Sequence, residues 1–299
     1  MRAWTRWPWP AGWETRVASD LDKSVPYNRR SAGMSEDRQR IGIIGYGYIG
    51  NYVYEQLTSR PELGLEVAFV YNRSREKIAA LPPEIALEKL EDFASKGADL
   101  IVELAHPRIT QEHGTTFLQQ TDYMPLSLTA LADAQLEQQL LETARRHDTC
   151  LYIPHGAVVG MDALEEGRQI WEEVRMVMKK PPRTLDFSAS PQFKAEEIRA
   201  ETVLYEGPTR GICPLFPRNV NSHAAVALAG IGFDRTQSVL VADPRLEVSV
   251  IEIEMRGQGV EVKVQRSNPM KGVSGVFTLV SSLASICRAK GPRSGLQLC

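Results

Sequence analysis

Short apolar runs alternate with segments of helical spacing from residue 40 to about residue 160. Nearly continuous apolar runs occupy residues 41–44, 65–71, 100–105 and 151–159. Strands that are buried on both faces of a parallel sheet have such uninterrupted runs. Regular alternation of strands and helices is typical of a doubly wound α/β sheet. We therefore expect residues 39–155 to form a first, α/β domain.

The pattern changes beyond residue 160. Ile251, Ile253 and Met255 alternate with Glu252 and Glu254, which predicts a strand with one solvated face. The Arg-Gly-Gln-Gly sequence at 256–259 is a hairpin signal before a second β run. Residues 156–270 are therefore predicted to form a substrate-carrying α+β domain with a mostly antiparallel sheet. Residues 271–299 are predicted to hold a closing helix, which returns to the first domain, and a tail.

Composition narrows the class of protein. The 299 residues include 43 % hydrophobic and 24 % charged residues, with a net charge of −2. This balance is typical of a globular domain and argues against a general nucleic-acid binder. No apolar run is long enough to span a bilayer. The four cysteines are scattered without metal-ligand spacing, which predicts reduced thiols in a cytoplasmic protein and no structural metal.

The first 38 residues differ from the rest. They hold four of the five tryptophans and show no hydrophobic period. They also lack the apolar segment of a secretory signal. We expect a disordered or non-native extension, and a mitochondrial presequence is the alternative.

A glycine loop follows the first predicted strand. Gly45, Gly47 and Gly50 match G-x-G-x-x-G, with Tyr48 and Ile49 between the last two glycines. After a strand and before a helix, this spacing is the fingerprint of a Rossmann dinucleotide site, in which the helix N-terminus faces the pyrophosphate. The sequence thus predicts an NAD(P)-binding Rossmann domain.

Two further segments are candidates for the nucleotide groove. The second strand ends at Asn72 and Arg73, where an NAD-selective site usually has an acidic residue. A guanidinium suits a 2′-phosphate, so NADP or dual use is favoured over strict NAD, unless Arg73 only caps a surface turn. Ala105 and His106 follow the third core strand at the edge where ligands bind. His106 has the alternative role of capping the next helix.

Several segments together resemble one enzyme family, the L-aspartate dehydrogenases. The matching segments are, in order, GYGYIG, VELAHP, HGAVVGMDAL, VLYEGPTRG, FPRNVNSHAAVALAGIG and VADPRLE. The resemblance implies a homodimeric NAD(P)-dependent oxidoreductase that interconverts L-aspartate and iminoaspartate, with oxaloacetate and ammonia downstream. It also implies that Ala157 and Asn221 lie beside the nicotinamide.

Asn221 also precedes a short alanine-rich helix, predicted over residues 222–229 and ended by Gly230 and Gly232. Its side chain is expected to cap that helix or to bind a cofactor amide. Asn219 is expected to be a loop residue whose side chain satisfies backbone groups.

The chain departs from the family at its catalytic histidine. Ungapped spacing from Asn221 places that position at Ile251, and a small shift places it at Ser249 or Val250. None of these side chains can act as a general acid or base, which is typically worth ~10²–10⁴ in rate. His223 is the first candidate for a substitute, and His155 is the second.

Three functions remain open. The first is an aspartate dehydrogenase impaired by the missing histidine. The second is a catalytically silent NAD(P)-binding sensor or partner-binding protein, and the third is a related imine or dihydrodipicolinate-type reductase. A small dicarboxylic amino acid or imine substrate requires cations in the site, and Arg210 and Arg218 are the candidates.

Overall fold

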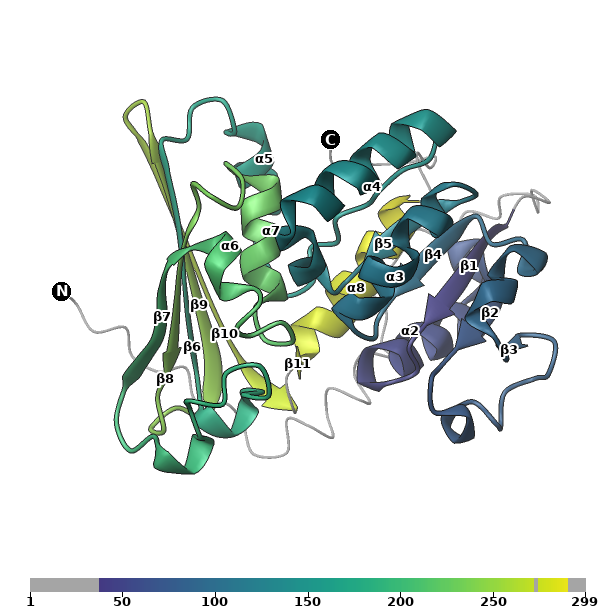
Figure 1. The fold of residues 1–299 in the computed structure, drawn as a ribbon, viewed down its shortest axis with the longest axis horizontal. Helices are drawn as coiled ribbons and strands as arrows, with labels where there is room; N and C mark the ends of the chain where they lie inside the picture. The colour runs from purple at the N-terminus through teal and green to yellow at the C-terminus, as the bar shows by residue number, and fades with distance from the viewer. Residues whose placement is uncertain (1–37, 272–273, 290–299) are drawn as a thin grey trace. The chain divides into compact units, whose positions relative to one another are not determined.

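The first domain is built on a parallel sheet. The computed structural model describes residues 38–271 and 274–289. Five parallel strands lie in the order β3-β2-β1-β4-β5 (Figure 1). Their bounds are β1 Gln39–Ile44, β2 Leu65–Tyr71, β3 Ala86–Leu87, β4 Leu100–Glu103 and β5 Asp122–Pro125. The doubly wound parallel sheet predicted from the apolar runs is thus confirmed.

Two local predictions in this domain are wrong. Residues 151–159 do not form a core strand, because Leu151 makes only one parallel bridge, to Tyr123. The strand at this edge is β5, whose four residues end at Pro125 and were too short to show a period. The helices predicted after β2 and before β4 are the short 3₁₀ segments η2 (Arg75–Lys77) and η3 (Leu90–Lys96).

Helices cover both faces of this sheet. They are α2 Tyr48–Ser59, α3 Pro107–Leu118, α4 Ala134–His147 and the C-terminal α8 Val276–Ala289. Leu283 and Ile286 of α8 are buried in one cluster with Val53 and Leu57 of α2. Helix α8 therefore packs on the first domain (Figure 1). Within the described residues, no helix is long and apolar enough to cross a membrane.

The second sheet is mixed, with six strands in the order β11-β10-β9-β6-β8-β7. Their bounds are β6 Glu173–Lys180, β7 Thr202–Pro208, β8 Gln237–Ala242, β9 Val248–Gly257, β10 Val260–Lys271 and β11 Ser274–Gly275. Only the β6–β8 pair is parallel. The predicted hairpin joins β9 to β10, with positive φ at Gln258 (46°) and Gly259 (81°). Positive φ at both central residues is the requirement of a type I′ turn.

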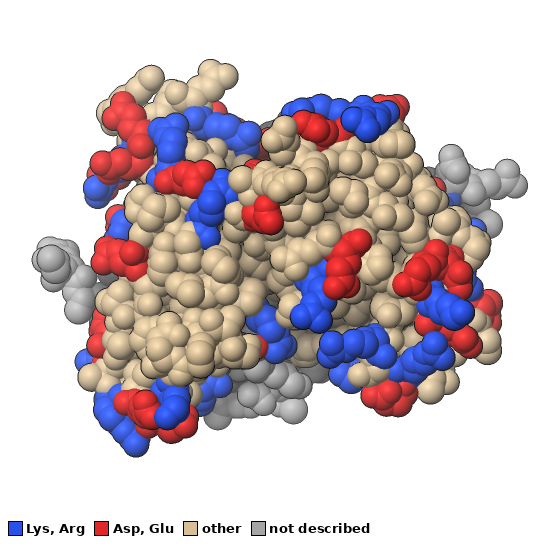
Figure 2. Space-filling view, viewed as in Figure 1, with Lys and Arg blue, Asp and Glu red and all other residues tan. Residues whose placement is uncertain are grey.

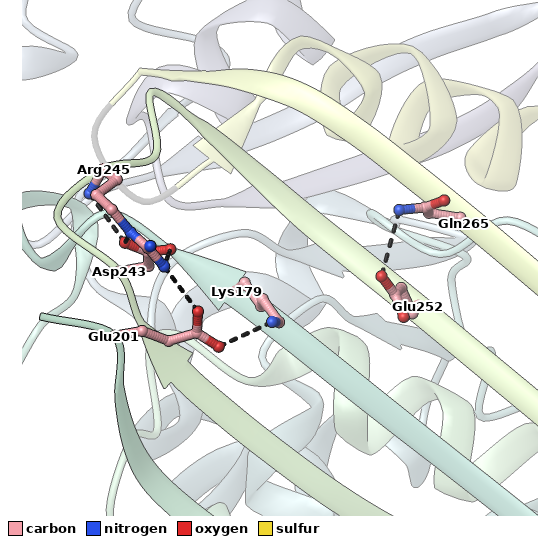
Figure 3. A network of polar contacts seen from close by, with 6 residues as sticks. All are labelled: Lys179, Glu201, Asp243, Arg245, Glu252 and Gln265. Carbon is pink, nitrogen blue, oxygen red and sulfur yellow. Dashed lines mark hydrogen bonds and ion pairs between the residues drawn. The ribbon is translucent and has the colours of Figure 1, made fainter. Parts of the chain in front are cut away.

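The two faces of this sheet differ in chemistry. Helices α5 Met161–Glu166, α6 Thr209–Ile212 and α7 Asn221–Ala229 pack on one face (Figure 1). The other face carries pairs such as Lys179 with Glu201 (2.9 Å), Arg245 with Glu201 (2.9 Å) and Gln265 with Glu252 (3.2 Å), drawn in Figure 3. Exposed ion pairs such as the two that Glu201 forms stabilise a fold little. These pairs identify the solvated face of the sheet. The intervening side chains of β6, β9 and β10 therefore point toward the helices.

Candidate functional site

The glycine loop between β1 and α2 has the geometry of a dinucleotide site. Gly45 adopts φ +102°, and its N–H donates to the carbonyl of Tyr71 (2.8 Å). A Cβ on Gly50 would overlap the carbonyl oxygen of Gly45, so only glycine allows the helix this close. A Cβ on Gly47 would meet no atom within 4 Å. That open space at the N-terminus of α2 fits a pyrophosphate, which needs close approach to backbone N–H groups.

Asn72 and Arg73 stand at the end of β2, beside this loop. The Asn72 amide accepts from the N–H of Tyr46 (2.9 Å) and donates to the carbonyl of Ser74 (2.8 Å). Asn72 therefore shapes the glycine loop with its side chain. Arg73 is exposed and forms no ion pair with any residue in the described part of the chain. Its guanidinium is thus available to a phosphate.

A buried carboxylate that the sequence did not single out organises the neighbouring loops. Glu103, at the end of β4, accepts from the N–H groups of Ala105 (2.6 Å) and His106 (2.7 Å). It also accepts from the N–H (3.1 Å) and hydroxyl (3.0 Å) of Ser127. Burial raises the pKa of Glu103 to about 7, although these hydrogen bonds favour its charged form. An acid at the end of an apolar strand was the signal available in the sequence.

His106 is the N-cap of α3. Its Nδ1 accepts from the N–H of Arg108 (3.2 Å). Partial burial lowers the pKa of His106, and the positive charges of Arg218, Arg108 and Arg73 lower it further. Several basic side chains also gather across the lower middle of the face drawn in Figure 2, over the region of α2 and the start of α3 in Figure 1. This edge of the sheet is therefore electropositive, as an anionic ligand requires.

A pocket lies next to the glycine loop, and residues of both domains line it. Ile49 of α2 and Ala157 line it, together with Asn221 of α7. Its ionisable lining residues are His155, Lys180, Arg218 and Arg266. No aspartate or glutamate lines it among the residues that the structure describes. A cavity with several cations and no acid is suited to a ligand that carries more than one negative charge.

Lys180 and Arg266 are pocket residues that the sequence reasoning missed. Lys180 is the last residue of β6 and is 2 % exposed. Burial, with the nearby charge of Arg266, lowers the pKa of Lys180 to about 8. The sequence held a signal for it, because Val174, Met176 and Met178 are also inward-facing and period two continues to Lys180.

Arg266 comes from β10 and is only partly exposed. Its Nε and Nη1 are buried without a hydrogen-bond partner among the described residues, and its guanidinium lies 5.9 Å from the ring centre of Phe277. Burial lowers the pKa of Arg266 to about 10. Unsatisfied buried donors on a charged group are costly, so a bound anion would relieve this cost.

The strand β9 presents the positions where the resemblance implies a histidine. Ser249 and Ile251 both line the pocket, whereas Val250 lies on the opposite side of the alternation. Ile251 is paired with Met178 on β6 and with Arg266 on β10. A histidine at 249 or 251 would face the pocket, and this chain has no ionisable group at either position.

Asn221 lies at the pocket but in a different role from the predicted cap. The residue before α7 is Val220, and no side chain caps this helix, so the predicted N-cap is wrong. The Oδ1 of Asn221 accepts instead from the N–H of Thr129 (3.3 Å) in η4 (Leu128–Ala132), which ties α7 to the first domain. Asn219 accepts from the N–H of Asp186 (3.0 Å), as expected for a loop residue.

The structure brings His155 to the pocket and keeps His223 away from it. His223 is 0 % exposed, and its Nδ1 lies 2.9 Å from the hydroxyl of Ser238. Burial lowers the pKa of His223 to about 3, and its Nε2 has no partner among the described residues. This placement does not fit the predicted catalytic role, because a substrate in the pocket cannot reach the ring. His155 does line the pocket, and burial and Arg288 lower its pKa.

Of the two arginines predicted to bind the substrate, only one lines the pocket. Arg210 forms a bidentate pair with Asp234 (2.6 and 2.7 Å) and donates to the carbonyl of Ala132 (2.6 Å). It does not line the pocket, so its predicted role in substrate binding does not fit the structure. Arg218 lines the pocket and is held by Asp186 (2.7 Å).

Comparison with known proteins identifies the family. Residues 162–289 match the family model described as aspartate dehydrogenase, C-terminal, and residues 45–154 match the NAD binding domain of homoserine dehydrogenase. A Xenopus tropicalis aspartate dehydrogenase domain-containing protein is 39 % identical over 284 residues, covering 89 % of this chain and 100 % of that protein. The chain belongs to the aspartate dehydrogenase family.

Another relative agrees with this assignment, and a solved structure supports the fold. The L-aspartate dehydrogenase of Methanosarcina mazei is 32 % identical over 263 residues, covering 83 % of this chain and 96 % of that protein. The crystal structure of aspartate dehydrogenase from Thermotoga maritima superposes with a TM-score of 0.64 at 22 % identity, covering 85 % of this chain and 96 % of that chain, and supports the fold. The resemblance drawn from the motifs is confirmed, and the chain is by family an NAD(P)-dependent amino-acid dehydrogenase.

Proposed function

We propose that this aspartate dehydrogenase family member interconverts L-aspartate and iminoaspartate, which is in equilibrium with oxaloacetate and ammonia. One observation carries the proposal. The pocket beside the glycine loop contains Lys180, Arg218 and Arg266 and, among its described lining residues, no acid. Relatives that cover most of this chain are named L-aspartate dehydrogenases.

The choice of a dicarboxylate follows from charge. Aspartate and oxaloacetate each carry two carboxylates, and guanidinium groups bind carboxylates in a planar, bidentate way. Arg218 reaches the pocket from the loop before α7, and Arg266 reaches it from β10. Two arginines on different walls of the pocket suit a ligand with two carboxylates better than a ligand with one carboxylate.

The cofactor is proposed to be NADP or either nicotinamide dinucleotide. When bound, the nicotinamide supplies the hydride acceptor or donor at its C4. The glycine loop around Gly47 holds the pyrophosphate, and Ala157 and Asn221 lie beside the nicotinamide. Exposed Arg73 at the end of β2 favours a 2′-phosphate.

A second candidate function is a silent NAD(P)-binding protein. It is favoured by Ser249 and Ile251, which line the pocket where the resemblance implies a catalytic histidine. A cytoplasmic location and a homodimer stay predictions.

The test measures NADPH and NADH oxidation by the purified chain with oxaloacetate plus ammonia. Pyruvate plus ammonia is the monocarboxylate control, and a dihydrodipicolinate-type imine tests the reductase alternative. Cofactor binding is measured separately by quenching of protein fluorescence. Turnover with oxaloacetate and not with pyruvate supports the proposal. Tight NADPH binding without turnover, combined with turnover in Ser249→His or Ile251→His, supports the silent protein.

A further inference from the structure

Three neighbouring strands present their side chains to the same end of the pocket. Arg266 on β10 is paired with Ile251 on β9, which is paired with Met178 on β6. Two residues further along β6, on the same face, stands Lys180, beside the strand position of Ser249. The ionisable groups on the strands that flank positions 249 and 251 are therefore Arg266, opposite Ile251 on β10, and Lys180, next to Ser249 on β6.

The other ionisable groups of the pocket are less suited to proton transfer at this end. Arg218 and Arg266 stay charged, because a guanidinium does not give up its proton at ordinary pH. His155 lies in the loop that also carries Gly156 and Ala157, and its backbone N–H donates to the hydroxyl of Ser285 in α8 (3.2 Å). In the proposed function, that loop lies on the nicotinamide side of the pocket.

We propose that Lys180 is the proton donor of this enzyme and performs the task for which the resemblance implies a histidine on β9. The inference rests on the proposed function. Ammonia adds to the ketone carbon of oxaloacetate and gives a carbinolamine. The Lys180 ammonium then donates a proton to the carbinolamine hydroxyl, the C–O bond breaks and water leaves. The nitrogen lone pair forms the C=N bond of the iminium, and Lys180 is left as a neutral amine that solvent reprotonates.

The surroundings of Lys180 fit a group that both gives and regains a proton. Among the described residues, the charged or titratable groups that share the pocket with it are Arg266 on β10, Arg218 before α7 and His155 before α5. All are basic, and burial with the charge of Arg266 lowers the pKa of Lys180 to about 8. Lysines tuned to this range by burial are effective general acids and bases near neutral pH.

The variant Lys180→Arg tests the role of Lys180 in proton transfer separately from the role of its positive charge. Arginine keeps the positive charge for binding an anion but cannot release a proton at neutral pH. We expect kcat for reductive amination of oxaloacetate to fall by ~10²–10⁴, with KM for oxaloacetate and NADPH affinity changed only a few-fold. In the parent, kcat/KM calculated for free ammonia should decline above about pH 8, and this decline should be absent in the variant. Lys180→Gln is the second variant if Lys180→Arg fails to bind NADPH.

Lys179→Arg is the matched control, because Lys179 lies on the opposite face of β6 and pairs with Glu201. It should behave as the parent. If Lys180→Arg keeps the parent kcat and pH profile, or if His155→Gln removes the decline instead, the inference is overturned while the proposed function stands. A parent that binds NADPH but shows no turnover overturns the proposed function and this inference with it.

Discussion

The glycine loop and the cationic pocket are adjacent and are built in opposite ways. The loop consists of six consecutive residues, and the missing side chains of its three glycines create the site, since Gly47 leaves open space and Gly50 permits contact with Gly45. The pocket consists of long side chains from separate strands and loops, with Lys180, Arg218 and Arg266 far apart in sequence. A site made by backbone is therefore local in the sequence, and a site made by side chains depends on the sheet that gathers them.

The glycine loop and the pocket also differ in how they respond to substitution. Substitution in the loop adds atoms, at Gly50 where the protein leaves no room and at Gly47 where the pyrophosphate would lie. Substitution in the pocket removes charge while leaving the fold in place. The four predictions below test this difference, in order of decreasing effect.

Gly50→Ala should have the largest effect. Its Cβ would overlap the carbonyl oxygen of Gly45, which forces β1 and α2 apart at a cost of about 3 kcal/mol in the free energy of unfolding. Urea denaturation measures this cost. Gly47→Ala is the matched variant, because its Cβ meets no atom within 4 Å. It should unfold like the parent and lose NADPH affinity in a fluorescence titration. Equal stability losses in the two variants would contradict the loop geometry described here.

Arg266→Met should come next. It removes a guanidinium that has two buried nitrogens without a hydrogen-bond partner in the described part of the chain, and it keeps an apolar side chain beside Phe277. We expect kcat/KM for oxaloacetate to fall ~30–100-fold, or about 2–3 kcal/mol, with thermal stability unchanged or raised. Arg256→Met on β9 is the control, since Arg256 is exposed and pairs with Glu261 (3.0 Å). A fall in kcat/KM of the same size in that control would show that the effect is not specific to the pocket.

His223→Asn should change stability and its pH dependence. The ring is neutral and buried, and its pKa is lowered from 6.5 to about 3. The unfolded chain therefore binds a proton that the folded chain excludes, and stability falls as pH drops below about 6.5, by up to ~1.4 kcal/mol per pH unit. The amide of asparagine retains a partner for Ser238 and does not titrate.

The difference in unfolding free energy between parent and His223→Asn should therefore shift in favour of the variant between pH 6.5 and 5. The variant must be compared with the parent because Glu103 also titrates, with a pKa raised to about 7. Protonation of Glu103 raises the stability of both proteins as pH falls, which is opposite to the effect of His223. A constant difference over this range would refute the buried neutral histidine. Catalysis at pH 8 should be little changed, since His223 does not line the pocket.

Arg73→Ala should have the smallest effect. Arg73 is exposed and has no ion pair among the described residues, so its removal leaves stability unchanged. We expect KM for NADPH to rise ~5-fold while KM for NADH stays constant, because only NADPH carries the 2′-phosphate. Equal changes for both cofactors would assign Arg73 to the surface turn alone.

Elements whose signals are local could be predicted from the sequence alone. Continuous apolar runs specified the parallel sheet, alternation at 251–255 specified a strand with one solvated face, and the glycine spacing placed the dinucleotide loop. The structure decided what depends on partners distant in the chain. His223 turned out to be buried against Ser238, Arg210 to be paired with Asp234, and Asn221 to be bonded to Thr129.

Lys180 shows most clearly what could not be predicted from the sequence. Period two in β6 assigns it to the inner face, but only the pairing of β6 with β9 and of β9 with β10 brings it beside Ser249, Ile251 and Arg266. Strand register is set by packing over the whole sheet, and no segment of the sequence carries that information alone.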